Sequence, residues 1–535
     1  MRATLECSPD LRAGPVLSSP AGSATSALPR LLSLAATAVL WLIVADCLVA
    51  SLGYLASKSG SSLSNTAVYA AGHLIAGGLL LAVWRSHSLR RRVGMAFDKI
   101  VPHLSQVRGV LLFIGAITVL RLAWVLFVPT RPTSDHAVYH GLAVRLAETG
   151  VYDTEKHRAY WPPGYPAFLA ALYAVFGPAV LVGKLGNVVL AGVADLLSWR
   201  VVRAHVGATA AVAALLLTAA WPGRNFHVDV LSYDELVLVL LLASLALLPG
   251  QKRCQEPFVQ STLRAAARQK VPDTFSATLR WIAAGFVLGL ACLVRPTLGV
   301  TPIAVGGWLL VGRCSWRRAV LCTALYTAAM LVPIVPWTVR NYVVLGRFVP
   351  LTTNAGGNFY NSWAPGGTGG FYKPGWEHLH AVTGGDELKL SPTGFALGLA
   401  AIREDPARAA WRAWQKQVHY LGSDNWLLPV ESYAAALAGD ASGGAILKAA
   451  LHTATNGWYV LLMLLPLVAG RGLVRRFQEQ PLAWLCLGLF ALGLIIHTVF
   501  ESQARYHLVY LPFWGLMLSV LLVRTDSRSE APPCR

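Results

Sequence analysis

Charged residues are scarce in this sequence. Asp, Glu, Lys and Arg make up only 13% of its 535 residues, whereas 55% are hydrophobic. A soluble protein needs more polar surface than this, and the mean hydropathy of +0.52 excludes that class. The composition predicts an all-α integral membrane protein that crosses the bilayer many times.

Cysteine pairs with metal-site spacing are also missing, and so are heptad arrays, soluble repeats and low-complexity tracts. The chain has eight cysteines, and none of them falls in a segment that we expect outside the cell. External disulfide bonds are therefore not expected.

What the sequence does contain is long apolar runs. Runs of about 20 apolar residues predict roughly twelve membrane-spanning helices. The number could differ by about two, because several runs are short or merge at Pro and Gly. The runs lie near 31–55, 66–84, 109–129, 179–200, 206–222, 236–249, 280–295, 298–312, 319–337, 447–469, 481–499 and 505–523.

The formal charge of +19 indicates how the chain is oriented in the membrane and does not indicate a nucleic-acid partner. Its basic residues gather in short segments between spans: "RSHSLRRR", "QKRCQEPFVQSTLRAAARQK" and "GRGLVRRFQ". The positive-inside rule predicts that these segments are cytoplasmic, which makes both termini cytoplasmic in the cell membrane.

This topology divides the chain into six parts. We expect a disordered cytoplasmic N-terminus, two extra spans with a basic cytoplasmic loop, a transmembrane core whose first outer loop covers 131–178, a long outer loop, the C-terminal spans and a cytoplasmic tail. In that order the parts are 1–30, 31–108, 109–340, 341–446, 447–523 and 524–535.

The first outer loop begins with "RPTSDHAVYHG". Apolar residues at helical spacing, followed by Gly150, predict a short amphipathic helix along the membrane surface. Asp135 stands at its start. Either Ser134 or Asp135 caps this helix, or Asp135 is a catalytic carboxylate, and the two roles are compatible.

A rigid turn follows in "HRAYWPPGYPAF". Its prolines restrict the backbone from Trp161 to Pro166, which suits either an aromatic anchor at the interface or a binding site. The apolar piece 167–178 is too short to span the membrane, so we expect it to dip in and return.

Three further outer turns carry polar side chains at membrane depth. Asp234 and Glu235 begin the sixth span, where a carboxylate is either functional or paired with an arginine. The glycine-rich run after Arg340 and Asn341 suits recognition of a sugar or serves as a flexible connector. In the last turn, Arg505 either grips a phosphate or reaches lipid headgroups.

The order of these motifs resembles the GT-C glycosyltransferases. The likeness runs through Asp135 with Tyr139, then "WPPGYPAFLAALYAVFG", "KLGNVVLAG", "LSYDEL", "LVRPT", "PWTVRNYVVLGRFVPLTTNAGGNFY" and "QARYHLVYLPF". It is strongest for the bacterial protein-O-mannosyltransferase and aminoarabinose-transferase branch, family 39 with its Rgt-like relatives. It covers roughly residues 109–523.

The resemblance implies a GT-C-type helical bundle with interfacial helices in the first outer loop. It also implies inverting transfer of a sugar from a polyprenyl-phosphate donor to a glycan, lipid or protein acceptor outside the cytoplasmic membrane. Asp135 would act as general base or help to hold a divalent metal, Mg²⁺ or Mn²⁺.

The sequence departs from the family pattern at two positions. His136 stands where many relatives have a second acidic residue, which weakens a metal held by two carboxylates. Trp161 replaces a lysine that meets the donor phosphate in aminoarabinose transferases, so nearby cations such as His157 would substitute.

The sequence hypothesis therefore assigns catalysis to Asp135. The candidates for donor-phosphate binding are Lys156, Arg158, Arg340 and Arg505. The candidates for substrate binding are Tyr139, Trp161, Tyr165, Asp234, Glu235, Asn341, Asn354 and Tyr506.

Three rival functions are open, and one of them is a non-catalytic membrane scaffold, which is favoured only if Asp135 proves dispensable. A transporter or flippase would place its charges near the midplane of the membrane and often has two related halves, neither of which the sequence shows. An O-antigen ligase or polymerase would also act on lipid-linked glycans outside.

Overall fold

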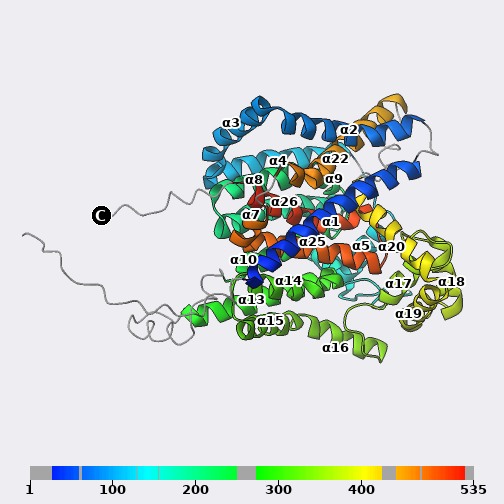
Figure 1. The fold of residues 1–535 in the computed structure, drawn as a ribbon. Helices are drawn as coiled ribbons and strands as arrows, with labels where there is room; N and C mark the ends of the chain where they lie inside the picture. Colours follow the sequence, from blue (N-terminus) through cyan, green and yellow to red (C-terminus); the bar gives the residue numbers. More distant parts are fainter. Residues whose placement is uncertain are drawn as a thin grey trace, which may run out of the picture.

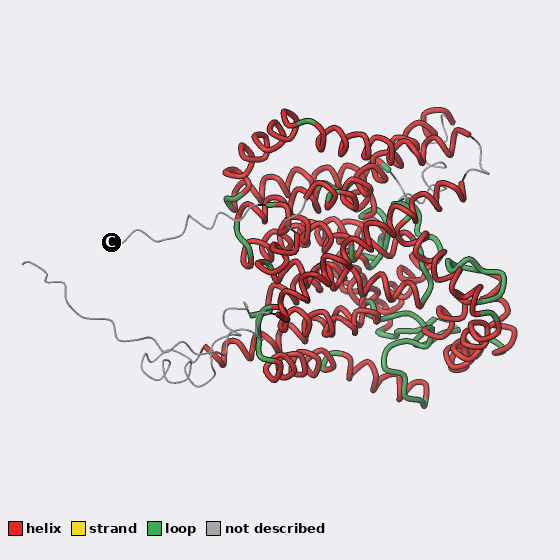
Figure 2. The backbone as a smooth tube through the Cα atoms, in the orientation of Figure 1, coloured by secondary structure: helices red, strands yellow, loops and turns green. Residues whose placement is uncertain are grey.

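The computed structural model is a bundle of helices, and no strand occurs in the part of the chain that it describes (Figures 1 and 2). The described residues are 27–58, 63–128, 130–154, 156–249, 273–424, 441–469 and 473–523. The predicted all-α fold is confirmed.

The helices follow one another along the whole chain. Their bounds are α1 Ala27–Lys58, α2 Leu63–Arg85, α3 His87–Leu104, α4 Val107–Phe127, α5 Asp135–Thr149, α6 Gly164–Phe176, α7 Val180–His205, α8 Ala208–Ala219, α9 Pro222–His227, α10 Asp234–Leu247, α13 Asp273–Val294, η1 Pro296–Val300, α14 Thr301–Val311, α15 Trp316–Leu331, α16 Ile334–Leu345, α17 Ala355–Trp363, α18 Lys373–Thr383, α19 Glu387–Glu404, α20 Pro406–Leu421, α22 Ala441–Leu464, α23 Pro466–Ala469, α24 Leu473–Glu479, α25 Pro481–Val499, η3 Ala504–Val509 and α26 Leu511–Leu522.

Several helices are long and apolar enough to cross a membrane. Five described helices pass that test, or six if the bent pair α15 and α16 forms one span. Each predicted span coincides with helix, but several of these helices are short, such as α8 and α26 with 12 residues each. The protein is therefore multi-pass, while the predicted count of about twelve is not confirmed.

The structure corrects three boundaries. Helix α1 already begins at Ala27, inside the expected disordered terminus, and the other N-terminal residues lie outside the described part. The segment 87–104, expected as a basic loop, is the helix α3. The expected outer loop 341–446 contains the end of α16 and the helices α17 to α20. The expected tail 524–535 and the basic segment 251–270 lie outside the described residues.

The glycines of the long outer segment have a different role from the expected one. A Cβ on Gly356 would collide with the Ser391 backbone, and one on Gly394 would collide with the Gly356 backbone. These two glycines let α17 and α19 pack with their backbones in contact. The run after Asn354 is thus a packed helix and not a flexible connector.

The basic helix α3 and the helices α17 to α19 lie at opposite ends of the bundle (Figure 1). This arrangement agrees with the predicted topology, in which these segments face opposite sides of the membrane. The orientation itself stays a prediction from the positive-inside rule.

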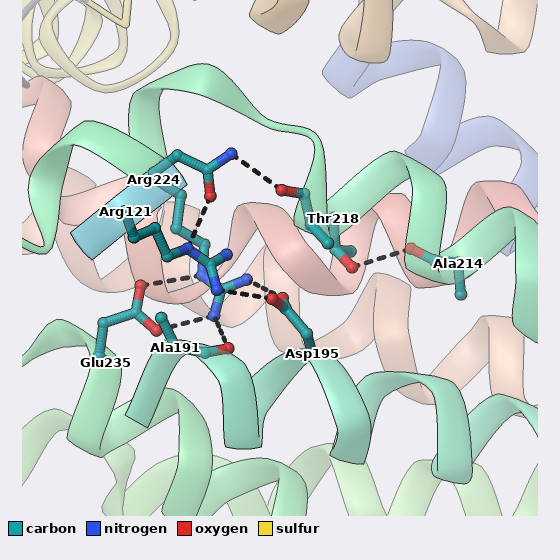
Figure 3. A network of polar contacts seen from close by, with 9 residues as sticks. Arg121, Ala191, Asp195, Ala214, Thr218, Arg224 and Glu235 are labelled. Atoms are coloured by element: carbon teal, nitrogen blue, oxygen red, sulfur yellow. Dashed lines mark hydrogen bonds and ion pairs between the residues drawn. The ribbon is translucent and has the colours of Figure 1, made fainter. Parts of the chain in front are cut away.

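A buried ion network joins four helices inside the bundle (Figure 3). Arg224 of α9 donates to both oxygens of Glu235, over 2.9 and 2.8 Å, and pairs with Asp195 of α7. Arg121 of α4 donates to the second oxygen of Asp195 over 2.8 Å and to Asn225 over 2.9 Å. Because these charges are fully desolvated, their mutual pairing is what makes their burial tolerable.

Candidate active site

A large cavity opens where the bundle meets the helices α17 and α18. Its volume is 1640 Å³, and its lining comes from segments far apart in the sequence. The lining residues are Arg131, Thr133, Ser134, Asp135, His136, Tyr139, His157, Tyr160, Trp161, Pro162, His227, Val230, Tyr233, Val294, Arg295, Pro296, Thr297, Thr352, Asn354, Ala355, Asn358, Phe371, Trp376, His380, Ile496, His497, Phe500, Glu501, Gln503, Arg505 and Tyr506.

Asp135 begins helix α5 and faces this cavity. The preceding Ser134 makes no side-chain capping bond and has a φ of 51°, a conformation that residues other than glycine rarely adopt. The Asp135 carboxylate instead meets Trp161 Nε1 at 3.4 Å and Arg505 Nη2 at 3.8 Å. Its side chain is 42% exposed, so a ligand can reach the carboxylate.

One wall of the cavity is aromatic. Trp161 packs against Tyr160 with ring centroids 4.4 Å apart, and Tyr160 lies 6.2 Å from Trp376 of α18. Tyr152 accounts for the position of Trp161, because its hydroxyl donates to the carbonyls of Trp161 and Pro162. The predicted rigid turn is therefore fixed by hydrogen bonds as well as by its prolines.

Another part of the lining is basic. Arg295, in the turn between α13 and η1, and Arg505 of η3 both face the ring of Tyr506, at 5.4 and 5.2 Å from its centroid. Arg295 also lies 5.7 Å from the ring of Tyr233. Both guanidinium groups are held by aromatic faces rather than by close carboxylates.

Two residues orient Arg295. Its Nη2 donates to His497 Nε2 over 2.9 Å, and His497 Nδ1 in turn donates to the Glu501 carbonyl over 2.8 Å, so His497 is the neutral tautomer. Asp234 lies 3.7 Å from Arg295 Nη1. Nη1 is buried, and no atom of the described residues makes a hydrogen bond to it.

Glu501 is the second carboxylate of the cavity. It is 7% exposed, and burial raises its pKa above the usual range, while the charge of Arg505 opposes that shift. Its Oε1 accepts from Gln503 and from the Tyr506 hydroxyl. Glu501 therefore helps to position Tyr506, against which both arginines lie.

His136 occupies the place of the second acidic residue of the family pattern. Its Nδ1 donates to the Leu231 carbonyl over 3.0 Å. Burial, and then the positive charges of Arg505 and His227, lower its pKa to about 4. The imidazole is consequently neutral at pH 7, with its Nε2 as a hydrogen-bond acceptor.

A divalent metal does not fit these residues. The described chain has no group of three His, Cys, Asp or Glu side chains placed to share an ion. The guanidinium of Arg505 lies 3.8 Å from the Asp135 carboxylate and would repel a cation held there. We derive no step through a metal.

The structure brings together only some of the residues singled out from the sequence. Those that line the cavity are Asp135, Tyr139, Trp161, Asn354, Arg505 and Tyr506. Those outside its lining are Lys156, Arg158, Arg340, Tyr165, Asp234, Glu235 and Asn341.

Arg340 and Arg158 are used in holding the outer loop in place. Arg340 donates to the carbonyls of Arg158 and Tyr152, and the Arg158 guanidinium donates to the Val344 carbonyl. The Arg158 backbone donates to Glu387 over 2.7 Å. Lys156 is exposed outside the cavity.

The other residues outside the lining are buried in scaffold contacts. Tyr165 donates to Asn187, and Asn341 donates to the carbonyls of Val349 and Leu351. Glu235 belongs to the network of Arg224. Asp234 contacts His227 and Arg295, which do line the cavity, so its influence on a ligand is indirect.

Sequence reasoning did not assign a role to Arg295, His497 or Trp376. Arg295 lies in the motif "LVRPT", where an arginine between an apolar helix and a proline is a signal for a charge held at membrane depth. His497 lies inside an apolar helix, and Trp376 lies in a segment without a motif. Only the fold shows that these two meet the cavity.

No family model matches the chain, and no curated protein sequence matches it. Two solved structures of ArnT from Cupriavidus metallidurans are similar to it. The structure bound to undecaprenyl phosphate has 17% identity over 78% of this chain and 77% of that chain, with a TM-score of 0.34. The apo structure has 17% identity over 77% and 76%, with a TM-score of 0.37. Such distant likeness carries no argument about activity.

Proposed function

We propose that this protein is a membrane glycosyltransferase that moves a sugar from a polyprenyl-phosphate donor to an acceptor hydroxyl. The observation that carries the proposal is the position of Asp135. It is an accessible carboxylate that stands between an aromatic wall and two guanidinium groups in a cavity of 1640 Å³. Aromatic side chains suit the binding of a sugar, and guanidinium groups suit the binding of a phosphate.

In the proposed reaction, the Asp135 carboxylate takes the proton of the acceptor hydroxyl. The acceptor oxygen forms a bond to the anomeric carbon as the bond from that carbon to the phosphate oxygen breaks, which inverts the configuration. The polyprenyl phosphate leaves with the bonding electrons. A single base suffices, because cations and not a proton stabilise this leaving group.

Arg295 and Arg505 are the groups that we assign to the phosphate. Arg295 lines the cavity and is paired with Asp234 only over 3.7 Å, and Arg505 places its Nη2 3.8 Å from Asp135. A phosphate gripped between them lies next to the base, so the anomeric carbon and the acceptor hydroxyl are brought together. Holding the reactants in this way contributes to the rate as well as to binding.

The proposal is tested with purified protein in nanodiscs and radiolabelled polyprenyl-phosphate mannose, glucose, galactose and arabinose. We expect the label of one donor to pass to membrane glycans added as acceptor. Asp135→Asn should lower this rate by roughly 10²- to 10⁴-fold, at equal protein level and thermal stability.

The matched control is Glu377→Gln, which removes an exposed carboxylate of α18 that does not line the cavity. It should leave the rate unchanged. Transfer from none of the four donors, or an unchanged rate in Asp135→Asn, would overturn the proposal. Vesicle-to-vesicle movement of the labelled lipid without transfer would favour a flippase instead.

A further inference from the structure

The charges of the cavity are unevenly distributed. The segments 157–162 and 352–380 contribute His157, Tyr160, Trp161, Pro162, Thr352, Asn354, Ala355, Asn358, Phe371, Trp376 and His380 to the lining. None of these is Asp, Glu, Lys or Arg. The charged lining residues are Arg131, Asp135, Arg295, Glu501 and Arg505, and all of them come from other parts of the chain.

The cations nearest to the uncharged region in sequence do not enter it. Arg158 and Arg340 are engaged with carbonyls, and Lys156 and Lys373 are exposed outside the cavity lining. None of the described residues that this region contributes to the lining therefore carries a fixed positive charge to neutralise a phosphate or a carboxylate. An anionic acceptor would lose hydration there without a cation to compensate for the loss.

The same region offers aromatic faces to a ring. His157, Tyr160 and Trp161 contact one another with centroids 4.4 to 5.6 Å apart, and Trp376 adds a further face 6.2 Å from Tyr160. Trp376 is positioned by the backbone of α17, since a Cβ on Gly357 would contact its ring at 2.7 Å. Flat, rigid rings of this kind suit the apolar faces of a sugar.

Amide groups with unused hydrogen-bonding capacity stand beside these rings. Asn354 and Asn358 are one helical turn apart at the start of α17, where the Asn358 N–H donates to the Asn354 carbonyl over 3.0 Å. Thr352 donates to the Asn354 side-chain oxygen. Within the described chain no hydrogen bond engages the Asn358 amide or the Asn354 NH₂ group, and each can serve sugar hydroxyls.

We infer that this uncharged region, formed by Tyr160, Trp161, Trp376, Asn354 and Asn358, is the acceptor subsite and that it takes an uncharged saccharide. The inference rests on the proposed function, because it names the acceptor class of the same site. Trp161 links the uncharged region to the proposed base, since its Nε1 lies 3.4 Å from Asp135. A sugar stacked on the aromatic wall presents a hydroxyl to that carboxylate.

The test measures saccharide binding without donor sugar and with polyprenyl phosphate in excess, so that the proposed phosphate site at Arg295 and Arg505 is filled. Saturation-transfer NMR on the full chain in nanodiscs is run with neutral trisaccharides of mannose, glucose and galactose and with the 6-phosphate of each. We expect at least one neutral trisaccharide to bind and its 6-phosphate to bind about tenfold more weakly or not at all. Tighter binding of the phosphates would overturn the inference.

Two substitutions locate the binding. Trp376→Ala should lower the affinity for the trisaccharide by about tenfold, whereas Trp376→Phe, which keeps an aromatic ring, should retain most of the affinity. The matched control is Trp411→Ala, which removes a tryptophan of α20 that is 60% exposed and outside the cavity. Equal affinity in Trp376→Ala and Trp411→Ala would contradict the subsite.

The outcome is separable from that of the proposed function. If neutral saccharides bind through Trp376 but no donor releases its sugar, the transfer chemistry falls and the binding site stands. If a donor sugar is transferred to phosphorylated acceptors as fast as to neutral ones, the acceptor inference falls and the transferase stands.

Discussion

The protein contains two clusters of arginines and carboxylates, and they are built differently. In the bundle, Arg224 meets both oxygens of Glu235 within 2.9 Å, and Asp195 is shared with Arg121. In the cavity, Arg505 stands 3.8 Å from Asp135, and Arg295 stands 3.7 Å from Asp234. Both oxygens of each bundle carboxylate are paired at short distance, while the cavity has longer ion pairs and an exposed carboxylate, Asp135, that a ligand can reach.

The length of the ion pairs distinguishes the structural cluster in the bundle from the candidate site more clearly than the types of residue do. A saturated buried pair tolerates no loss of a partner, because the remaining charge is left without solvation. A loosely paired charge at a cavity wall can lose its partner with less damage to folding and more damage to ligand binding. Substitutions in the two clusters should therefore act on different measurements.

The largest effect on stability is expected in the bundle. Arg224→Met leaves Glu235 and one oxygen of Asp195 buried without their cation, a loss of the kind that costs about 3–5 kcal/mol. We expect little folded protein and a much lower midpoint of thermal unfolding in detergent. Arg108→Met, at an exposed position of α4, is the control, and an equal midpoint for both variants would contradict the comparison.

A smaller effect, on substrate affinity, is expected in the cavity. Arg295→Gln removes a charged donor to the proposed phosphate, a contact worth about 1.5–3 kcal/mol, so the KM for the donor should rise roughly 10- to 100-fold. Arg295→Lys should recover only part of this, because lysine lacks the planar fork.

Arg340→Gln provides the contrasting case within the same prediction. The sequence proposed this arginine for the phosphate, but its guanidinium is bonded to the carbonyls of Arg158 and Tyr152. We expect the KM for the donor to change far less than in Arg295→Gln. A rise as large as that of Arg295→Gln would place the phosphate near the outer loop instead.

The smallest effect is the pH dependence of stability at His136. Its pKa is about 4 in the folded protein and about 6.5 in an unfolded chain. Between these values the unfolded state binds more protons, so stability falls as the pH is lowered from about 6.5 to 4 and is constant above that range.

His136→Gln keeps a neutral polar group and removes this dependence. The unfolding midpoint of the wild type should fall more between pH 7 and pH 5 than that of the variant. The other charged or titratable groups that face His136 are Arg505, His227 and Asp135, and they remain in both proteins. Identical pH profiles would show that His136 is already protonated or exposed.

The local pattern of the chain was sufficient to predict the positions of the apolar helices and of α5 in the first outer loop. Helix α5 begins at Asp135 and ends before Gly150, which has a φ of 70°, because the apolar period and the glycine act over a few residues. Of the two alternatives for the glycines of α17, the flexible connector was wrong, since their close packing on α19 involves a segment far away in the sequence.

What the sequence by itself determined is the membrane class, the position of most helices and the candidate carboxylate Asp135, since hydropathy and helical period are properties of neighbouring residues. Only the tertiary structure decided which arginines line the cavity. Arg340 and Arg505 look alike in the sequence. In the fold, the Arg340 guanidinium donates to backbone carbonyls 182 and 188 positions away, whereas the Arg505 guanidinium lies against the ring of Tyr506 and beside Asp135. The hydrogen-bonding capacity that remains to a buried charge depends on its partners in space, and the folded chain alone brings those partners together.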